Sequence, residues 1–531
     1  MKRSETSLRG GVTFVASLWC RSLKEYESLL SVGTMPRFAG WLLICFLSVA
    51  VSLLVNLSVS MRVPVFTLPV WTAVAFIVLA KGVRLFDCNC FQGECQTNPA
   101  TLSFRFAFLV FVLYAVLLYV NGYSVSSDVE GQWIQAQQGK FYDWHPVLHS
   151  LFFWLVQTVW DNKIFACIVQ IALFSLSVAW LESTLRKYAT LGWIRMLVVA
   201  LAGFSPIMLS LGMRTLMKDA LFAVAVVSLM TAVLRIFWSE GQWLEAWPHK
   251  ILFAFLVLCA SFLRHNGIFM TIPLLLLLCF MKKKEARMNY LLTFFLSLAF
   301  SLGYFCGRNA LIRLGVVGNS EGQKYVEAIG VPIAIIGDVM TCAPDSLDAD
   351  TRRFCERLCP LEVWKMHYRG DGNSIKRYLD FEYLRREVPP RDFFKYLCRI
   401  VKSSPKDAYK AVKRITSIAW NPFPLEKFWR TPPAGNILRT SDFFGVCDLI
   451  LHPPLGWVLG APGFAMLMLL ISGVVSLLKF GVARAAPHVA LCAYIVGTGA
   501  LMYDNGISDF RFFWAVELAY PIVLLSSFKR G

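Results

Sequence analysis

Long apolar runs separated by short polar or basic segments fill most of the 531-residue chain. About twelve of these runs are long enough to cross the ~30 Å hydrocarbon core of a bilayer, which takes about 20 helical residues. We expect spans at approximately 40–60, 64–82, 104–121, 163–181, 194–213, 219–238, 250–264, 267–281, 288–307, 455–479, 485–503 and 510–528. The pattern predicts an all-α, polytopic transmembrane helix bundle.

Two stretches depart from this pattern. The apolar run 250–281 is interrupted by "RHNG", and we divide it there because Arg264 and His265 would be unfavourable near the middle of a bilayer. The run 146–160, "PVLHSLFFWLVQTVW", is short and begins with Pro146. We therefore expect it to form an amphipathic helix that lies in the membrane interface.

Composition supports the membrane setting. The chain is 57% hydrophobic and 16% charged, whereas soluble proteins are usually about 25% charged. The net charge of +18 comes from short basic clusters between apolar runs, which is typical of cytoplasmic membrane loops. We therefore expect the lipid bilayer, and no nucleic acid, as a partner. The fifteen cysteines are scattered and predict no secreted disulfide scaffold.

The positive-inside rule favours cytoplasmic N- and C-termini. This orientation places these basic residues in the cytoplasm: Lys2, Arg3, Arg9, Arg21, Lys81, Arg84, Arg186, Lys187, Lys282, Lys283, Lys284, Lys479, Arg484, Lys529 and Arg530. The predicted organisation is a cytoplasmic segment 1–39, a transmembrane core 40–307 with its first external loop at 122–162, an external helical domain 308–454 and C-terminal spans in 455–531. The turns "MRTLMKD", "RHNG" and "YDNGISDFR" fall on the same external face.

A series of short motifs lies in or next to these external segments. They are "DVEGQW", "YDWHPVLHSLF", "LMKDALF", "FLRHNG" and "SDFRFFWAVELAYP". In this order they resemble the GT-C superfamily of polytopic glycosyltransferases, which includes protein O-mannosyltransferases and aminoarabinose transferases. The nearest pattern is that of a bacterial branch with an Asp, an HP pair, a KD pair, an R-x-N-G turn and a late D-x-R. The resemblance covers most of 104–310 and 500–525.

The resemblance implies a glycosyltransferase of the bacterial inner membrane. It would take a sugar from a polyprenyl-phosphate donor and transfer it, on the periplasmic face, to a glycan, lipid or protein acceptor. The first external loop would hold the catalytic carboxylate, and the domain 308–454 would cover the site. The sequence does not specify the sugar or the acceptor.

Such a transfer needs a carboxylate base for the acceptor hydroxyl and cations for the departing phosphate. Asp128 is the candidate base, and its alternative is a solvated loop acid or a helix N-cap. His145 is the second catalytic candidate, with ordinary capping before Pro146 as its alternative. Asp143 and His145 could orient the acceptor or a divalent cation. His145 and His149 could also share a metal ion, although Pro146 interrupts that geometry.

Charged residues at the outer ends of the spans are candidates for binding the donor phosphate. Each could instead be a helix-end charge that snorkels to the interface. Asp219 could pair with Lys218 or cap the following helix, and Asp509 could hold Arg511 in place. The set comprises Arg214, Lys218, Asp219, Arg264, Asp509 and Arg511.

The domain 308–454 has helical patterns of its own. "PPRDFFKYLCRIV" places Phe393, Phe394, Leu397, Ile400 and Val401 at helical spacing. "SSPKDAYKAVKRI" predicts a helix capped by Ser404, with Pro405 first and Asp407 completing a capping box. Five cysteines could form disulfides outside the cytoplasm: Cys342, Cys355, Cys359, Cys398 and Cys447.

Two rival functions remain open. A transporter or flippase of lipid-linked glycans also needs many helices, but its charges should lie near the membrane midplane. An O-antigen-ligase-like transferase would favour cations over a base carboxylate.

The motif "DCNCFQGEC", which we expect in the cytoplasm, offers three thiolates, one fewer than a usual structural zinc site.

Overall fold

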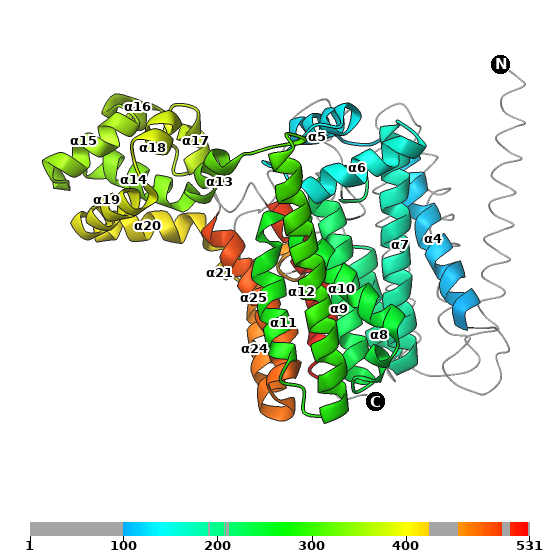
Figure 1. Ribbon diagram of the computed structural model, residues 1–531. Helices are drawn as coiled ribbons and strands as arrows, with labels where there is room; N and C mark the ends of the chain where they lie inside the picture. The colour runs from blue at the N-terminus through cyan, green and yellow to red at the C-terminus, as the bar shows by residue number, and fades with distance from the viewer. Residues whose placement is uncertain are drawn as a thin grey trace, which may run out of the picture.

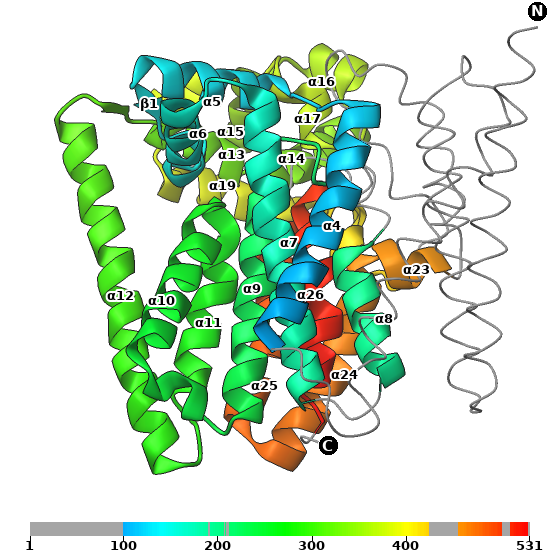
Figure 2. The ribbon, with the colours of Figure 1, turned by 90° about the vertical axis from the view of Figure 1, so that its right-hand side faces the viewer.

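The computed structural model describes residues 99–188, 192–205, 208, 212–423, 455–501 and 510–528. The expected segment 1–39, the spans 40–60 and 64–82 and the motif "DCNCFQGEC" lie outside the described residues. The described part is mostly helical. Figures 1 and 2 show a bundle of roughly parallel helices with a smaller helical domain beside one end.

The bundle is built around α9 (Lys218–Trp238), which is almost entirely buried. It packs against α7 (Lys163–Tyr188), α10 (Trp247–Phe262) and α26 (Trp514–Leu525). The remaining bundle helices are α4 (Pro99–Asn121), α8 (Gly192–Gly203), α11 (Ile268–Leu278), α12 (Lys284–Arg313), α23 (Leu455–Gly460), α24 (Pro462–Phe480) and α25 (Val482–Ala500).

Four of the described helices, α7, α9, α12 and α24, are long and apolar enough to cross a membrane. Helices α7, α9 and α12 cover the spans expected at 163–181, 219–238 and 288–307. Helix α24 covers the later part of the span expected at 455–479, whose first residues form the separate helix α23. In α12 only 17% of the most apolar window is buried, and Phe295 and Leu302 are exposed on this helix. Figure 2 shows α12 at the margin of the bundle, so lipid is the natural solvent for this apolar face. The count of about twelve spans and the orientation remain predictions.

The apolar run 250–281 does break at "RHNG". Helix α10 ends at Phe262, a 3-10 turn, η4, covers His265–Gly267, and α11 begins at Ile268. Gly267 is required there, because a Cβ at this position would lie 2.0 Å from the carbonyl oxygen of Ala260. The two helices can therefore approach closely at the turn.

One expected span is wrong as a continuous helix. We expected a span over 194–213, but α8 ends at Gly203. Tyr114 donates a hydrogen bond to the Gly203 carbonyl at 2.6 Å, which satisfies a backbone acceptor at the end of α8. The chain then reaches α9 through Thr215, which forms an isolated parallel bridge with Ser124.

The helical domain has its own hydrophobic core, with Trp364, Phe393 and Ile400 fully buried in it. It follows α12 and the short strand β2 (Val317–Gly318), and α21 (Ser417–Trp420) leads back to the bundle. Its elements are α13 (Glu321–Ala328), α14 (Gly330–Cys342), η5 (Pro344–Ser346), α15 (Ala349–Leu358), α16 (Leu361–His367), α17 (Gly372–Lys376), α18 (Phe381–Arg386), α19 (Pro390–Ser403) and α20 (Pro405–Ile415).

Two local expectations in this domain need correction. On α19, Phe393 and Ile400 face the core as expected, but the Phe394 side chain is 52% exposed. Helix α20 begins at Pro405 as expected, but the Ser404 hydroxyl donates to Asp407 Oδ2 at 2.8 Å and caps no backbone N–H. The described cysteines of this domain are all free, and Cys447 lies outside the described residues.

Candidate functional site

The segment 122–162, which we expected to be external, lies across one end of the bundle, where Figure 1 shows α5 and α6 beside the end of α7. It contains α5 (Ser127–Gln138), β1 (Phe141–Tyr142) and α6 (Val147–Val159). Strand β1 pairs in parallel with β2, which follows α12. The bridge between Ser124 and Thr215 ties the start of the loop to the segment before α9. These two connections fix the loop over the bundle.

Asp128 lies in the first turn of α5. The N-cap of this helix is Ser126, whose hydroxyl accepts from Val129 N at 3.3 Å. The alternative in which Asp128 is the N-cap is therefore wrong. The Asp128 side chain is 39% exposed, and its negative charge is favoured at the N-terminal end of a helix.

His145 lies between Asp128 and Lys218. Its Nε2 atom is 4.0 Å from Asp128 Oδ1, and its Nδ1 atom is 3.5 Å from the Lys218 ammonium. A lysine ammonium can only donate, so this contact favours the tautomer with the imidazole proton on Nε2, facing Asp128. The Trp144 ring stacks on the imidazole at 5.0 Å. The loop thus presents a carboxylate and an imidazole beside the first residue of α9.

His149 is fully buried and lies close enough to His145 and Lys218 for their charges to act on it. Its Nδ1 atom is 3.1 Å from Gln132 Oε1, and Gln132 donates to the Ser150 hydroxyl at 3.0 Å. Burial lowers the pKa of His149 to about 3, and the Lys218 charge adds to this effect. His149 is therefore neutral near pH 7. Within the described residues, no group of three His, Cys, Asp or Glu side chains could hold a metal ion.

Arg264 and Asp219 form a buried ion pair, with side chains that are 7% and 2% exposed. Asp219 lies in the first turn of α9, next to Lys218 in the sequence, but its carboxylate pairs with Arg264 of the "RHNG" turn. The Arg264 guanidinium also lies 4.3 Å from the centroid of the Phe512 ring. Its charge is already neutralised by Asp219, so we assign it to holding together α9, the "RHNG" turn and the segment just before α26.

Asp143 and Arg214 also make contacts that position the loop. Arg308 Nη1 lies 3.7 Å from Asp143 Oδ2, and the Asp143 side chain is 2% exposed. Arg214 Nη1 donates to the Gly122 carbonyl at 2.9 Å. Arg308 was missed from the sequence, because the span was expected to end at 307 whereas α12 continues to Arg313.

His265 is a second residue that the sequence did not single out as part of the site. Its Nε2 atom is 3.1 Å from the Trp144 carbonyl oxygen, and the adjacent Asn266 donates to the Thr498 hydroxyl at 2.7 Å. The "RHNG" turn therefore contacts both the loop 122–162 and α25. The histidine in that motif could have indicated this contact, because a turn between two apolar helices lies at the end of the bundle, where other loops also lie.

The last two predicted site residues are not described. Asp509 lies outside the described residues, and so does the side chain of Arg511, whose backbone belongs to the 3-10 turn η6 (Phe510–Phe513). In comparisons with known proteins, no family model, no curated protein and no solved structure matches the chain.

Proposed function

We propose that the protein is a membrane glycosyltransferase of GT-C type. It transfers a sugar from a polyprenyl-phosphate donor to an envelope glycan, lipid or protein on the periplasmic face of the bacterial inner membrane. The observation that carries this proposal is the convergence of Asp128, His145 and Lys218 at one end of an apolar helix bundle. A carboxylate, an imidazole and an ammonium meet there, and we place the lipid-linked phosphate of the donor beside them.

In the proposed reaction the acceptor hydroxyl attacks the anomeric carbon of the donor. Asp128 takes the hydroxyl proton as the new C–O bond forms and the bond from the anomeric carbon to the phosphate oxygen breaks. The 4.0 Å between Asp128 and His145 exceeds hydrogen-bond distance, so the carboxylate keeps acceptor capacity for that hydroxyl. A positioned base of this kind typically contributes 10²–10⁴-fold to the rate.

The departing polyprenyl phosphate needs a positive charge beside it. Lys218 supplies that charge, and its ammonium also fixes the tautomer of His145. Arg264 pairs with Asp219, so in this proposal it does not serve as a phosphate ligand. Arg511 remains a proposed second phosphate ligand, on the argument that the "SDFR" motif precedes the final span.

One observation favours a second candidate, a transporter of lipid-linked glycans. Glu517 lies within α26 and is 4% exposed, and neither of its carboxylate oxygens has a hydrogen-bond partner among the described residues. Acidic side chains inside a membrane span commonly mark ion or proton pathways. If Glu517 carries such a pathway, Glu517→Gln should abolish transport while leaving any glycosyl transfer unchanged.

Mass spectrometry of lipid-linked sugars and envelope glycans tests the choice between these functions. Cells lacking the protein should accumulate a polyprenyl-phosphate sugar and lose one sugar from an envelope glycan, lipid or protein. A transporter would instead leave its complete lipid-linked glycan on the cytoplasmic leaflet. Unchanged donor and glycan profiles would contradict the glycosyltransferase proposal.

A further inference from the structure

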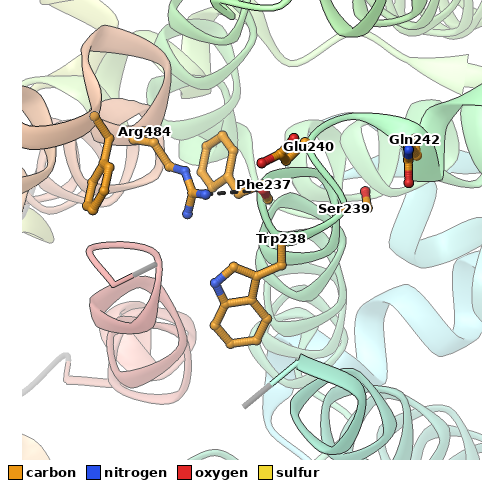
Figure 3. A pocket seen from close by; sticks show the side chains of 7 residues that line it. Phe237, Trp238, Ser239, Glu240, Gln242 and Arg484 are labelled. Carbon is orange, nitrogen blue, oxygen red and sulfur yellow. Dashed lines mark hydrogen bonds between the residues drawn. The ribbon is translucent and has the colours of Figure 1, made fainter. Parts of the chain in front are cut away.

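A pocket of about 500 Å³ lies where α9 ends, close to the junction of α24 and α25 (Figure 3). Helix α9 begins at Lys218 in the candidate site and ends at Trp238 in this pocket. Its 21 residues span about 30 Å at 1.5 Å per residue. The pocket is therefore at the opposite end of the bundle. Its lining residues are Phe237, Trp238, Ser239, Glu240, Gln242, Phe480 and Arg484.

Trp238 brings an unsatisfied donor to this pocket. The residue is 4% exposed, and its indole Nε1 has no hydrogen-bond partner among the described residues. A buried N–H without an acceptor is destabilising. In Figure 3 the indole nitrogen lies on the edge of the ring nearer to Arg484. The position suits a ligand that offers a hydrogen-bond acceptor.

Arg484 contributes positive charge from the start of α25. Its two terminal nitrogens donate to the carbonyl oxygens of Ser526 and Phe237, each at 3.1 Å. These carbonyls are at or near helix C-termini, which carry only partial negative charge. Among the described residues Arg484 forms no ion pair with a carboxylate, and a guanidinium has five N–H donors. Donors thus remain for a ligand.

The rim of the pocket is also basic. Glu240, the carboxylate in the lining, forms an exposed ion pair with Lys283. Lys282 is exposed and lies beside Gly481, since a Cβ added to Gly481 would be 3.1 Å from the Lys282 Cε atom. Among the described residues named here, Arg484, Lys282 and Lys283 are cations and Glu240 is the carboxylate. Aromatic side chains, Phe237 and Phe480, flank the guanidinium with centroids 4.8 and 5.5 Å away.

We propose that this pocket binds a phosphate group, either that of an anionic phospholipid headgroup or free phosphate. Trp238 Nε1 and Arg484 would donate to the phosphate oxygens, and Lys282 would attract the anion to the rim. Basic pockets between transmembrane helices bind anionic headgroups in this way. The site is separate from the candidate glycosyl-transfer site and does not depend on that function.

Native mass spectrometry of the full-length protein in a neutral detergent tests this proposal. The protein is titrated with phosphatidylglycerol or phosphatidylcholine carrying the same acyl chains. We expect one phosphatidylglycerol to bind at concentrations where phosphatidylcholine does not. Trp238→Phe keeps the ring and removes the donor, so it should weaken this binding by roughly tenfold. Trp243→Phe is the matched control, because its buried indole N–H also lacks a described partner but does not line the pocket.

Lys282→Gln is a second test variant, on the exposed rim, and should weaken binding several-fold without disturbing the core. Inorganic phosphate at millimolar concentration distinguishes the two sources. Displacement of the lipid, or direct phosphate binding that Trp238→Phe weakens, would identify free phosphate as a ligand, whereas retention of the lipid would identify the headgroup. Equal binding of both lipids without any phosphate binding would overturn the proposal. Equal effects of Trp238→Phe and Trp243→Phe would also overturn it.

Discussion

The buried ion pair between Asp219 and Arg264 makes a sharp prediction about stability. Asp219→Asn keeps the size of the side chain but leaves Arg264 buried without a counter-charge. Both side chains are nearly inaccessible, at 2% and 7%. Breaking a buried pair by removing one partner is typically destabilising by about 3–5 kcal/mol. The free energy of unfolding of Asp219→Asn should fall by an amount in this range.

Glu130→Gln is the matched control. Glu130 pairs with Lys163 at 2.7 Å, but their side chains are 48% and 21% exposed, and such pairs contribute about 0–1 kcal/mol. Reversible unfolding of the purified full-length protein in mixed micelles supplies the comparison. Adding Arg264→Met to Asp219→Asn should recover much of the loss, because it removes the uncompensated charge. If Asp219→Asn were no more destabilising than Glu130→Gln, our assignment of the Asp219–Arg264 pair to holding α9 and the "RHNG" turn together would be wrong.

Three further predictions concern pH, topology and donor binding. Burial lowers the pKa of His149 to about 3, against a usual 6.5. Its contribution to stability is therefore complete above pH 6.5 and falls by up to about 1.4 kcal/mol per pH unit as the pH decreases below 6.5. The free energy of unfolding measured from pH 7 to 5 should depend less steeply on pH in His149→Gln, and equal slopes would contradict this. After reduction, a membrane-impermeant thiol reagent should label the exposed Cys342 and Cys398 in intact cells but not Cys88, whose labelling would reverse the orientation. Arg511→Lys should markedly raise the donor concentration needed for half-maximal transfer, because it loses the planar fork. An unchanged donor dependence would leave Arg511 as a helix-end charge.

The sequence was informative where hydrophobic periodicity alone determines structure. It located the four long apolar helices, the break at "RHNG" and the amphipathic helix α6. It did not define the end of α8, because the apolar run continues beyond Gly203, where this helix ends. Apolar composition cannot distinguish a span from a shorter buried helix followed by a turn.

The site shows the same division. The motifs that carry Asp128, His145 and Lys218 were recognisable one by one. Their convergence depends on the pairing of strand β1 with β2, which lies 176 residues further along the chain. The pairing of Asp219 with Arg264 was missed for a similar reason, since the adjacent Lys218 was the obvious partner in sequence. Long-range pairing of charges depends on how the helices pack.

The most direct measurement of the central proposal is turnover by the purified full-length protein. It is supplied with a panel of polyprenyl-phosphate sugars and an envelope extract as acceptor, and release of polyprenyl phosphate is followed over time. At least one donor should be consumed, with Asp128→Asn slower by roughly 10²-fold and Glu130→Gln close to the unmodified protein. Consumption of no donor in the panel, or equal rates for Asp128→Asn and the unmodified protein, would contradict the proposal.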